Sequence, residues 1–126
     1  MNKYANTEKD IHIRIRRFVT TCFVNVVRRI PKVPENIPII QQVSASLTSV
    51  GANDQEADAA NSNKDFILKC TIVKKEVKET KYWLTLIRDT AILDKIILDP
   101  YINESQEILL IVSKIIQNSK LNLSIK

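Results

Sequence analysis

Glycine is nearly absent from this chain, because Gly51 is the one glycine among 126 residues. Sheets and loop-rich folds use glycine at turns and bulges, whereas helices disfavour it because it loses the most backbone freedom on folding. Isoleucine, lysine and leucine are frequent instead. The composition therefore favours an all-helical protein.

Long apolar runs are also missing. No run approaches the roughly 20 residues that a transmembrane helix needs. The first residues are polar and do not contain the apolar core of a signal peptide. We therefore expect a soluble, cytoplasmic protein without membrane contact, folded as one domain over residues 1–126.

The residues that most often build metal sites and nucleophilic centres are scarce. His12 is the one histidine, and Cys22 and Cys70 occupy apolar helical positions without the spacing of a zinc site or a disulfide framework. Nucleophile elbows, HExxH pairs and phosphate-binding glycine loops are absent from the sequence. We expect a protein that is not an enzyme and binds no cofactor or metal, with both cysteines buried and His12 on the surface.

Four segments carry apolar residues at helical spacing. They predict an all-α protein, an antiparallel up-down-up-down four-helix bundle, with helices at about residues 9–30, 37–60, 63–90 and 100–119. Asn36, Ser62 and Asp99 are the expected N-caps of the last three helices, with Pro100 in a first helical turn. The strongest pattern is the seam of the third helix, at Phe66, Cys70, Val73, Val77, Thr80, Leu84, Ile87 and Ala91.

Three of these helices are apolar over a wider stripe than one bundle core requires. Surplus apolar stripes on a small bundle usually mean self-association, so we expect a homo-oligomer. The second helix is rich in small residues, and a glycine inside a helix costs about 1 kcal/mol relative to alanine. Gly51 is therefore expected to mark a close approach of a neighbouring helix.

Positive charge is concentrated at the start of the chain. The net charge is +5, and residues 1–34 contain eight Lys or Arg against two Asp or Glu, a local charge of +6. On the first helix, Arg14, Arg17, Thr21, Asn25 and Arg28 recur at steps of three and four and predict one exposed ridge. The candidate contacts to nucleic acid or another polyanion are Arg14, Arg17, Arg28, Arg29 and Lys32. The alternative is an ordinary solvated surface.

A second candidate site lies where the second and third helices face each other. The predicted members are Asn53, Glu56, Glu76, Glu79 and Trp83. A carboxylate-bridged metal site of the ferritin type needs Glu-x-x-His pairs, which this chain lacks. The preferred interpretation is a hydrogen-bonded polar layer, with Trp83 as a core or interface anchor rather than a base-stacking residue.

Several unrelated residue types occur together at fixed spacing from the first helix into the fourth. They are Pro31-Lys32, Gln42, Ser46, Ser49-Val50-Gly51-Ala52-Asn53, Glu56-Ala57, Ser62, Asp65-Phe66-Ile67, Lys75-Glu76, Glu79-Thr80 and Tyr82-Trp83-Leu84. In these residues the chain resembles the four-helix-bundle family first noted in intervening sequences of bacterial 23S ribosomal RNA genes. It departs from that family at Asp54-Gln55, where a bulky residue and often an arginine are usual.

The resemblance implies a bundle that assembles as a ring, typically a homopentamer, with no established catalytic activity. A related accessory protein of diversity-generating retroelements has a similar pentamer and binds nucleic acid alongside a reverse transcriptase. The expected function is thus a non-catalytic, homo-oligomeric nucleic-acid-binding accessory protein, associated with RNA or a ribonucleoprotein. The alternative is a structural scaffold ring that has no affinity for nucleic acid.

Overall fold

Four long helices make up the computed structural model, which describes the backbone of residues 3–125 and the side chains of residues 11–123. They are α1 (Lys3–Asn25), α2 (Ile37–Asp58), α3 (Asn63–Asp89) and α4 (Lys95–Ile125). Two short 3₁₀ turns, Val27–Arg29 and Pro34–Asn36, lie between α1 and α2. Over residues 3–125 there is no strand, which confirms the all-helical prediction.

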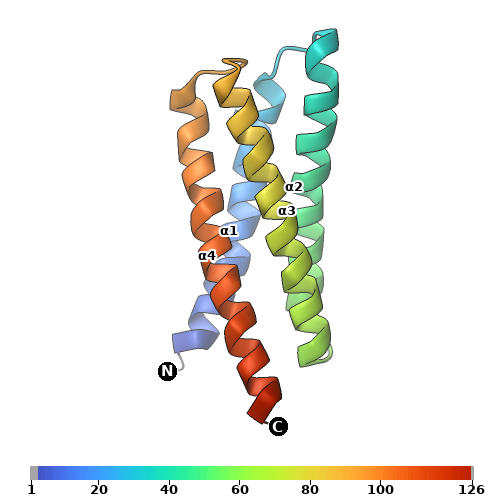
Figure 1. Cartoon of the computed structure of the whole chain (residues 1–126), viewed down its shortest axis with the longest axis vertical. Coiled ribbons are helices and arrows are strands. Elements are labelled where there is room, and N and C mark those ends of the chain that lie inside the picture. Colours follow the sequence, from blue (N-terminus) through green and yellow to red (C-terminus); the bar gives the residue numbers. More distant parts are fainter. Residues whose placement is uncertain (1–2, 126) are drawn as a thin grey trace.

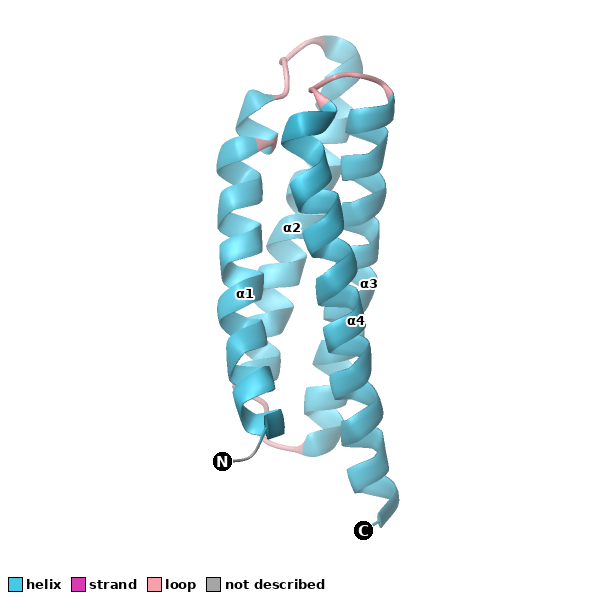
Figure 2. Cartoon of the chain, turned by 90° about the vertical axis from the view of Figure 1, so that its left-hand side faces the viewer, coloured by secondary structure: helices cyan, strands magenta, loops and turns pink. Residues whose placement is uncertain are grey.

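The helices lie side by side as a four-helix bundle (Figure 1). Helix α3 packs most extensively against α2 and α4, while α1 rests against α2 and α4 over fewer residues. The α1–α2 and α3–α4 connections lie at one end of the molecule, and the α2–α3 turn lies at the other (Figure 2). Residues on the facing sides of adjacent helices are therefore far apart in the sequence.

The seam of α3 forms the centre of the core. Its members Val73, Val77, Leu84 and Ile87 are almost completely removed from solvent, and Cys70 and Thr80 are buried beside them. Side chains spaced by four and three residues share one face of a helix, which is why this pattern was readable in the sequence. From α2, the buried residues Val43, Leu47, Val50 and Ala57 face the same core.

Short polar side chains fix the α2–α3 pair at two levels. The hydroxyl of Thr80 lies 2.8 Å from that of Ser46 inside the core. At the turn, Ser62 Oγ accepts a 3.1 Å hydrogen bond from the backbone N–H of Asp65, as predicted for the cap of this helix. Small hydroxyl side chains thus allow the two helices to pack closely while their polar groups stay satisfied.

The ends of α1 differ from the prediction. The helix begins at Lys3 rather than Lys9 and ends at Asn25, and the 3₁₀ turn replaces its predicted last turn. Ile30 is already extended, with φ −66° and ψ 123°, as expected for a residue before a proline such as Pro31. Asn36 is not a side-chain cap, because its Nδ2 donates to the carbonyl of Pro31 at 2.9 Å.

Helix α4 begins one turn earlier than predicted. Asp94 is its cap, since its Oδ1 accepts a 2.8 Å hydrogen bond from the N–H of Ile96. Pro100 therefore lies inside the helix instead of in its first turn. Leu98 is fully buried and anchors the extra turn. Burial has outweighed the local cost of a proline within a helix.

The expected close helix approach at Gly51 is absent. A Cβ atom added to Gly51 would lie 3.9 Å from the nearest atoms, the two γ-methyl groups of Val19 on α1. This is ordinary van der Waals contact, so the position has room for alanine.

Candidate nucleic-acid interface and interhelical polar contacts

Arg14 is held within the bundle by two glutamates of α4. Its Nε and Nη2 donate to the two carboxylate oxygens of Glu104 at 2.8 and 2.7 Å, and Nη2 also contacts Glu107. These hydrogen bonds, to Glu104 first and Glu107 second, raise the pKa of Arg14 further above its usual value. A bidentate pair of this kind fixes geometry as well as charge. Arg14 therefore joins α1 to α4 rather than presenting an open cation.

The predicted ridge of α1 is divided by its contact with α4. Asn25 Nδ2 donates to the hydroxyl of Tyr101 at 2.6 Å, and that hydroxyl lies 3.3 Å from the carbonyl of Thr21. Arg17 and Arg28 lie on the exposed side of the helix. The structure thus places Arg14, Thr21 and Asn25 in the α1–α4 seam and leaves the other two arginines in solvent.

The remaining basic candidates are available on the surface. Arg17, Arg28, Arg29 and Lys32 are all exposed. Within the part of the chain whose side chains are described, none of the four forms an ion pair. Arg17 is separated from the other three by more than two turns of helix, so the set forms one cluster near the end of α1 and one isolated charge.

Two members of the predicted polar layer have other partners. Asn53 Nδ2 donates to the carbonyl of Ser49 in its own helix at 2.9 Å. The carboxylate of Glu56 is 58% exposed and lies 3.1 Å from Lys69 Nζ. Neither side chain bonds to the glutamates of α3, so the layer predicted between α2 and α3 does not form within one chain.

The other three members share the flank of α3 that faces α2. Desolvation, followed by the charge of Glu79, raises the pKa of Glu76. Trp83 Nε1 is buried and lacks a hydrogen-bond partner among the described residues. Tyr82 packs edge-on against the indole, with ring centroids 4.9 Å apart. This flank therefore carries a buried indole N–H without a partner among the described residues, and a half-buried carboxylate whose pKa is raised.

His12 and Asp54 form a contact that the sequence analysis missed. His12 Nδ1 lies 2.7 Å from Asp54 Oδ1, and Nε2 lies 3.4 Å from Asp58 Oδ1. The side chain of His12 is 15% exposed and that of Asp54 is 5% exposed, so the expectation of a surface histidine is wrong. The signal was available, because Asp54 continues the apolar stripe of Leu47 and Val50. The histidine also borders a polar groove of about 640 Å³ at the α2–α3 turn.

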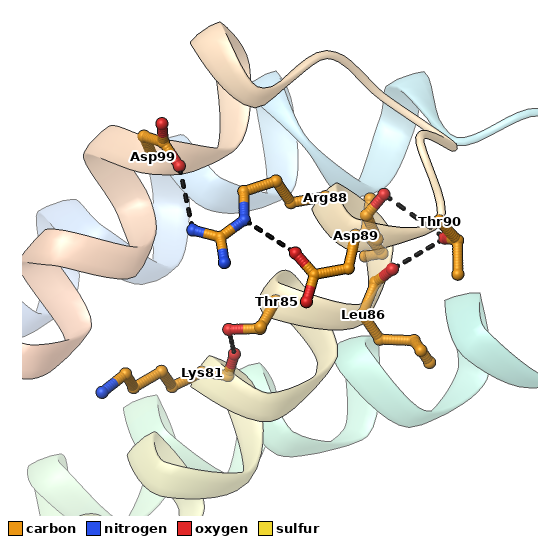
Figure 3. Close-up of polar contacts among 8 residues, drawn as sticks. Lys81, Thr85, Leu86, Arg88, Asp89, Thr90 and Asp99 are labelled. Carbon is orange, nitrogen blue, oxygen red and sulfur yellow. Dashed lines mark hydrogen bonds and ion pairs between the residues drawn. The ribbon is translucent and has the colours of Figure 1, made fainter.

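Arg88 shows how α3 and α4 are joined at the opposite end of the bundle. Its Nε donates to Asp89 at 3.0 Å, and its Nη1 donates across to Asp99 of α4 at 3.1 Å (Figure 3). The hydrogen bonds to Asp89 and then Asp99 raise the pKa of this arginine. Its charge is therefore matched within the chain.

The cysteines are placed as predicted. Cys22 and Cys70 are both buried, and neither forms a disulfide. Burial raises the pKa of the Cys22 thiol to about 12, so it stays protonated and unreactive at neutral pH.

Over residues 11–123, no three His, Cys, Asp or Glu side chains gather in a way that could hold a metal ion. None of the described helices combines the length and the apolar character needed to cross a membrane.

Comparisons with known proteins agree with the fold and with the resemblance drawn from the sequence. A comparison with curated proteins finds no match. The crystal structure of a protein of unknown function from the S23 ribosomal protein family of Bacteroides thetaiotaomicron superposes with a TM-score of 0.79 at 31% identity, over 88% of this chain and 98% of that one. Residues 9–114 match the family described as 23S rRNA-intervening sequence protein. The chain therefore belongs to the 23S rRNA-intervening sequence protein family.

Proposed function

We propose that this protein is a non-catalytic, homo-oligomeric accessory protein that binds nucleic acid, in the first place RNA within a ribonucleoprotein. Antiparallel up-down-up-down bundles would assemble as a ring of five subunits in the cytoplasm. A reverse transcriptase is one candidate protein partner. The observation that carries the proposal is the group of exposed cations without carboxylate partners, in a chain whose family is described by its link to 23S rRNA.

Self-association is supported by the flank of α3 next to α2. Trp83 Nε1 is buried there without an acceptor among the described residues, and on the outer side of α3 Leu68 and Tyr82 are 56% and 59% exposed. Ala45 and Ala52 of α2 are small and exposed, so another helix could approach closely. A second subunit could supply the missing acceptor and cover the apolar surface, as buried donors and exposed apolar patches usually require.

Nucleic-acid binding is supported by the charge that α1 and the following turn leave in solvent. Arg28, Arg29 and Lys32 are exposed within a few residues of one another. A ring would repeat this cluster in every subunit, so that weak phosphate contacts would add through multivalency. Affinity of this kind falls steeply with salt because bound counterions are released.

Two measurements test the proposal on the full chain. Light scattering after size exclusion is expected to give a multiple of the chain mass, with five copies as the proposed number. Filter binding of a labelled structured RNA is expected to weaken by at least tenfold between about 50 and 200 mM salt. A stable monomer would remove the ring, and binding that is absent at both salt concentrations would remove the nucleic-acid function.

The alternative is a scaffold ring without affinity for nucleic acid. It is favoured by apolar side chains on the outer side of α4, where Ile96, Leu110 and Leu121 are 77%, 62% and 61% exposed. Such a surface suits a protein partner better than a phosphate backbone. An oligomer of the expected size that binds no RNA would support this function over the first.

A further inference from the structure

The face that joins α3 to α4 carries basic residues that the sequence analysis did not single out. Lys74, Lys78 and Lys81 are spaced by four and three residues and therefore share one side of α3. Lys81 Nζ donates to Gln106 Oε1 of α4 at 2.6 Å, which shows that this side borders α4. Lys114 lies two turns beyond Gln106 on α4 and is exposed. We call these four lysines the α3–α4 lysine face.

Contacts along the two helices fix how the lysines align. Arg88 pairs with Asp99, and Lys81, seven residues earlier in α3, pairs with Gln106, seven residues later in α4. A further step of seven places Lys74 opposite Ser113, beside Lys114. The lysine face is therefore continuous over at least two helical turns.

This face resembles the cluster at the end of α1, because its cations have no carboxylate partners among the described side chains. Among the described side chains, none of the four lysines forms an ion pair. Of the nearby acids, Glu104 and Glu107 both contact Arg14, and Glu107, seven residues before Lys114 on α4, is itself 62% exposed. The charge of the lysine face is not neutralised within the chain.

The neighbouring polar side chains of α4 are suited to the same ligand, and Leu110, between Gln106 and Lys114, is an exposed apolar member of the same surface. Gln106, Ser113 and Gln117 lie along the edge of α4 that borders α3, and they offer amide and hydroxyl groups. Such side chains, together with lysine, make most protein contacts to phosphate oxygens. The nearest exposed ring on α3, that of Tyr82, already packs against Trp83, so the face offers charge and hydrogen bonds rather than a stacking platform.

We propose that the α3–α4 lysine face is the main phosphate-contact surface of this protein and takes the backbone of duplex RNA without reading its sequence. Lys74 and Lys81 are about 10 Å apart along the helix axis at a rise of 1.5 Å per residue. That length covers about three phosphates of one duplex strand. This inference rests on the proposed nucleic-acid function and assigns its principal site.

The test compares three variants of the full chain that each lose three positive charges. K74Q/K78Q/K114Q removes most of the face and leaves the Lys81–Gln106 contact intact. R17Q/R28Q/K32Q removes the rival surface around α1. K64Q/K75Q/K95Q is the matched control, because these exposed lysines lie outside both surfaces and form no ion pair among the described side chains. The probe is a hairpin RNA with a duplex stem, and a scrambled stem of equal length tests sequence dependence.

The face variant is expected to bind at least tenfold more weakly near 100 mM salt, with a log–log salt slope reduced by about 2 to 3 per engaged subunit. The α1 variant is expected to lose less, and the control to match the wild type. Circular dichroism and scattering mass should be the same for all. Unchanged affinity and slope in the face variant, with a wild type that binds, would overturn this inference and leave the proposed function standing. A wild type that binds no RNA would instead remove the proposed function.

Discussion

The two flanks of α4 offer different partners to the basic residues of the neighbouring helices. On the α1 side, Arg14 meets two carboxylates, of Glu104 and Glu107. On the α3 side, Lys81 meets the neutral amide of Gln106. Both cations belong to stripes that look alike along their own helices. The facing helix, rather than the stripe, decides which charges remain available to a partner.

This difference separates the local charge of a sequence segment from the charge that remains available to a partner. The first 34 residues have the highest local charge, but Arg14 is neutralised across the bundle. The lysines of α3 share their helix with Glu76 and Glu79, so the net charge summed along the helix understates the positive charge on the lysine side. Lys74, Lys78 and Lys81 lie towards α4, whereas Lys69 pairs with Glu56 on the α2 side.

The largest expected effect on stability comes from removing the contact of His12 with Asp54. His12→Ala leaves the carboxylate of Asp54, which is 5% exposed, without its 2.7 Å partner. We expect a loss of about 2–4 kcal/mol in the free energy of unfolding, as for other buried pairs that lose one member. Denaturant unfolding at fixed protein concentration measures it. H12A/D54A should lose less than the sum of the two single changes, and simple additivity would show that the two groups do not interact.

A smaller loss of stability is expected when the ion pairs of Arg14 with Glu104 and Glu107 are removed. Arg14→Gln leaves Glu104 and Glu107 without their shared cation, and we expect a loss of about 1 kcal/mol because Arg14 and Glu104 are about one-third exposed. A double-mutant cycle with Glu104→Gln would isolate the pair. RNA affinity should hardly change. Unaltered stability together with weaker RNA binding would reverse the roles assigned to Arg14 and the lysines.

The pH dependence of stability tests the role of Glu76 on the other flank of α3. Its pKa in the folded chain is raised above the ordinary 4.5 by desolvation and by Glu79. The folded chain then binds this proton more tightly than the unfolded chain, so stability declines as pH rises through that pKa. Glu76→Gln removes the decline and should melt at a higher temperature than the wild type at pH 7. The gap should close below pH 4.5 in a thermal series, and a gap that is constant with pH would contradict the assignment.

The smallest change in stability is expected for Gln106→Glu. This substitution gives the α3 side of α4 a carboxylate, as the α1 side already has. A carboxylate beside Lys81 should stabilise the fold by no more than about 0.5 kcal/mol, as for exposed pairs. The same change should weaken RNA binding, because it places an acid on the lysine face. Gln106→Met is the neutral control. Equal RNA affinity for wild type, glutamate and methionine would argue against contact at this position.

The parts of the molecule that the sequence predicts well depend on local periodicity. The α3 seam from Cys70 to Ile87 was readable because its spacing of four and three places all its members on one face. The start of α4 was missed because Asp94 and Asp99 are both plausible caps, and local rules favour the one before Pro100. Burial of Leu98 decided between them, and burial depends on the assembled bundle.

The candidate site was harder to predict for a related reason. Arg14 and Glu104 are 90 residues apart, and His12 and Asp54 are 42 apart. No window of sequence contains both members of either pair. Helical spacing gives the side of a helix on which a charge lies, but the register between helices decides what it meets. Contacts in the folded chain, such as that of Lys81 with Gln106, define this register.

Trp83 gives the chain an internal optical label, because it is the one tryptophan in the sequence. Its indole lies on the flank of α3 proposed to receive another subunit, beside a carboxylate and with its N–H unsatisfied. Fluorescence emission at a series of dilutions should therefore shift towards the red as subunits part and water reaches the ring. Assembly could thus be followed at micromolar concentration without attaching a dye.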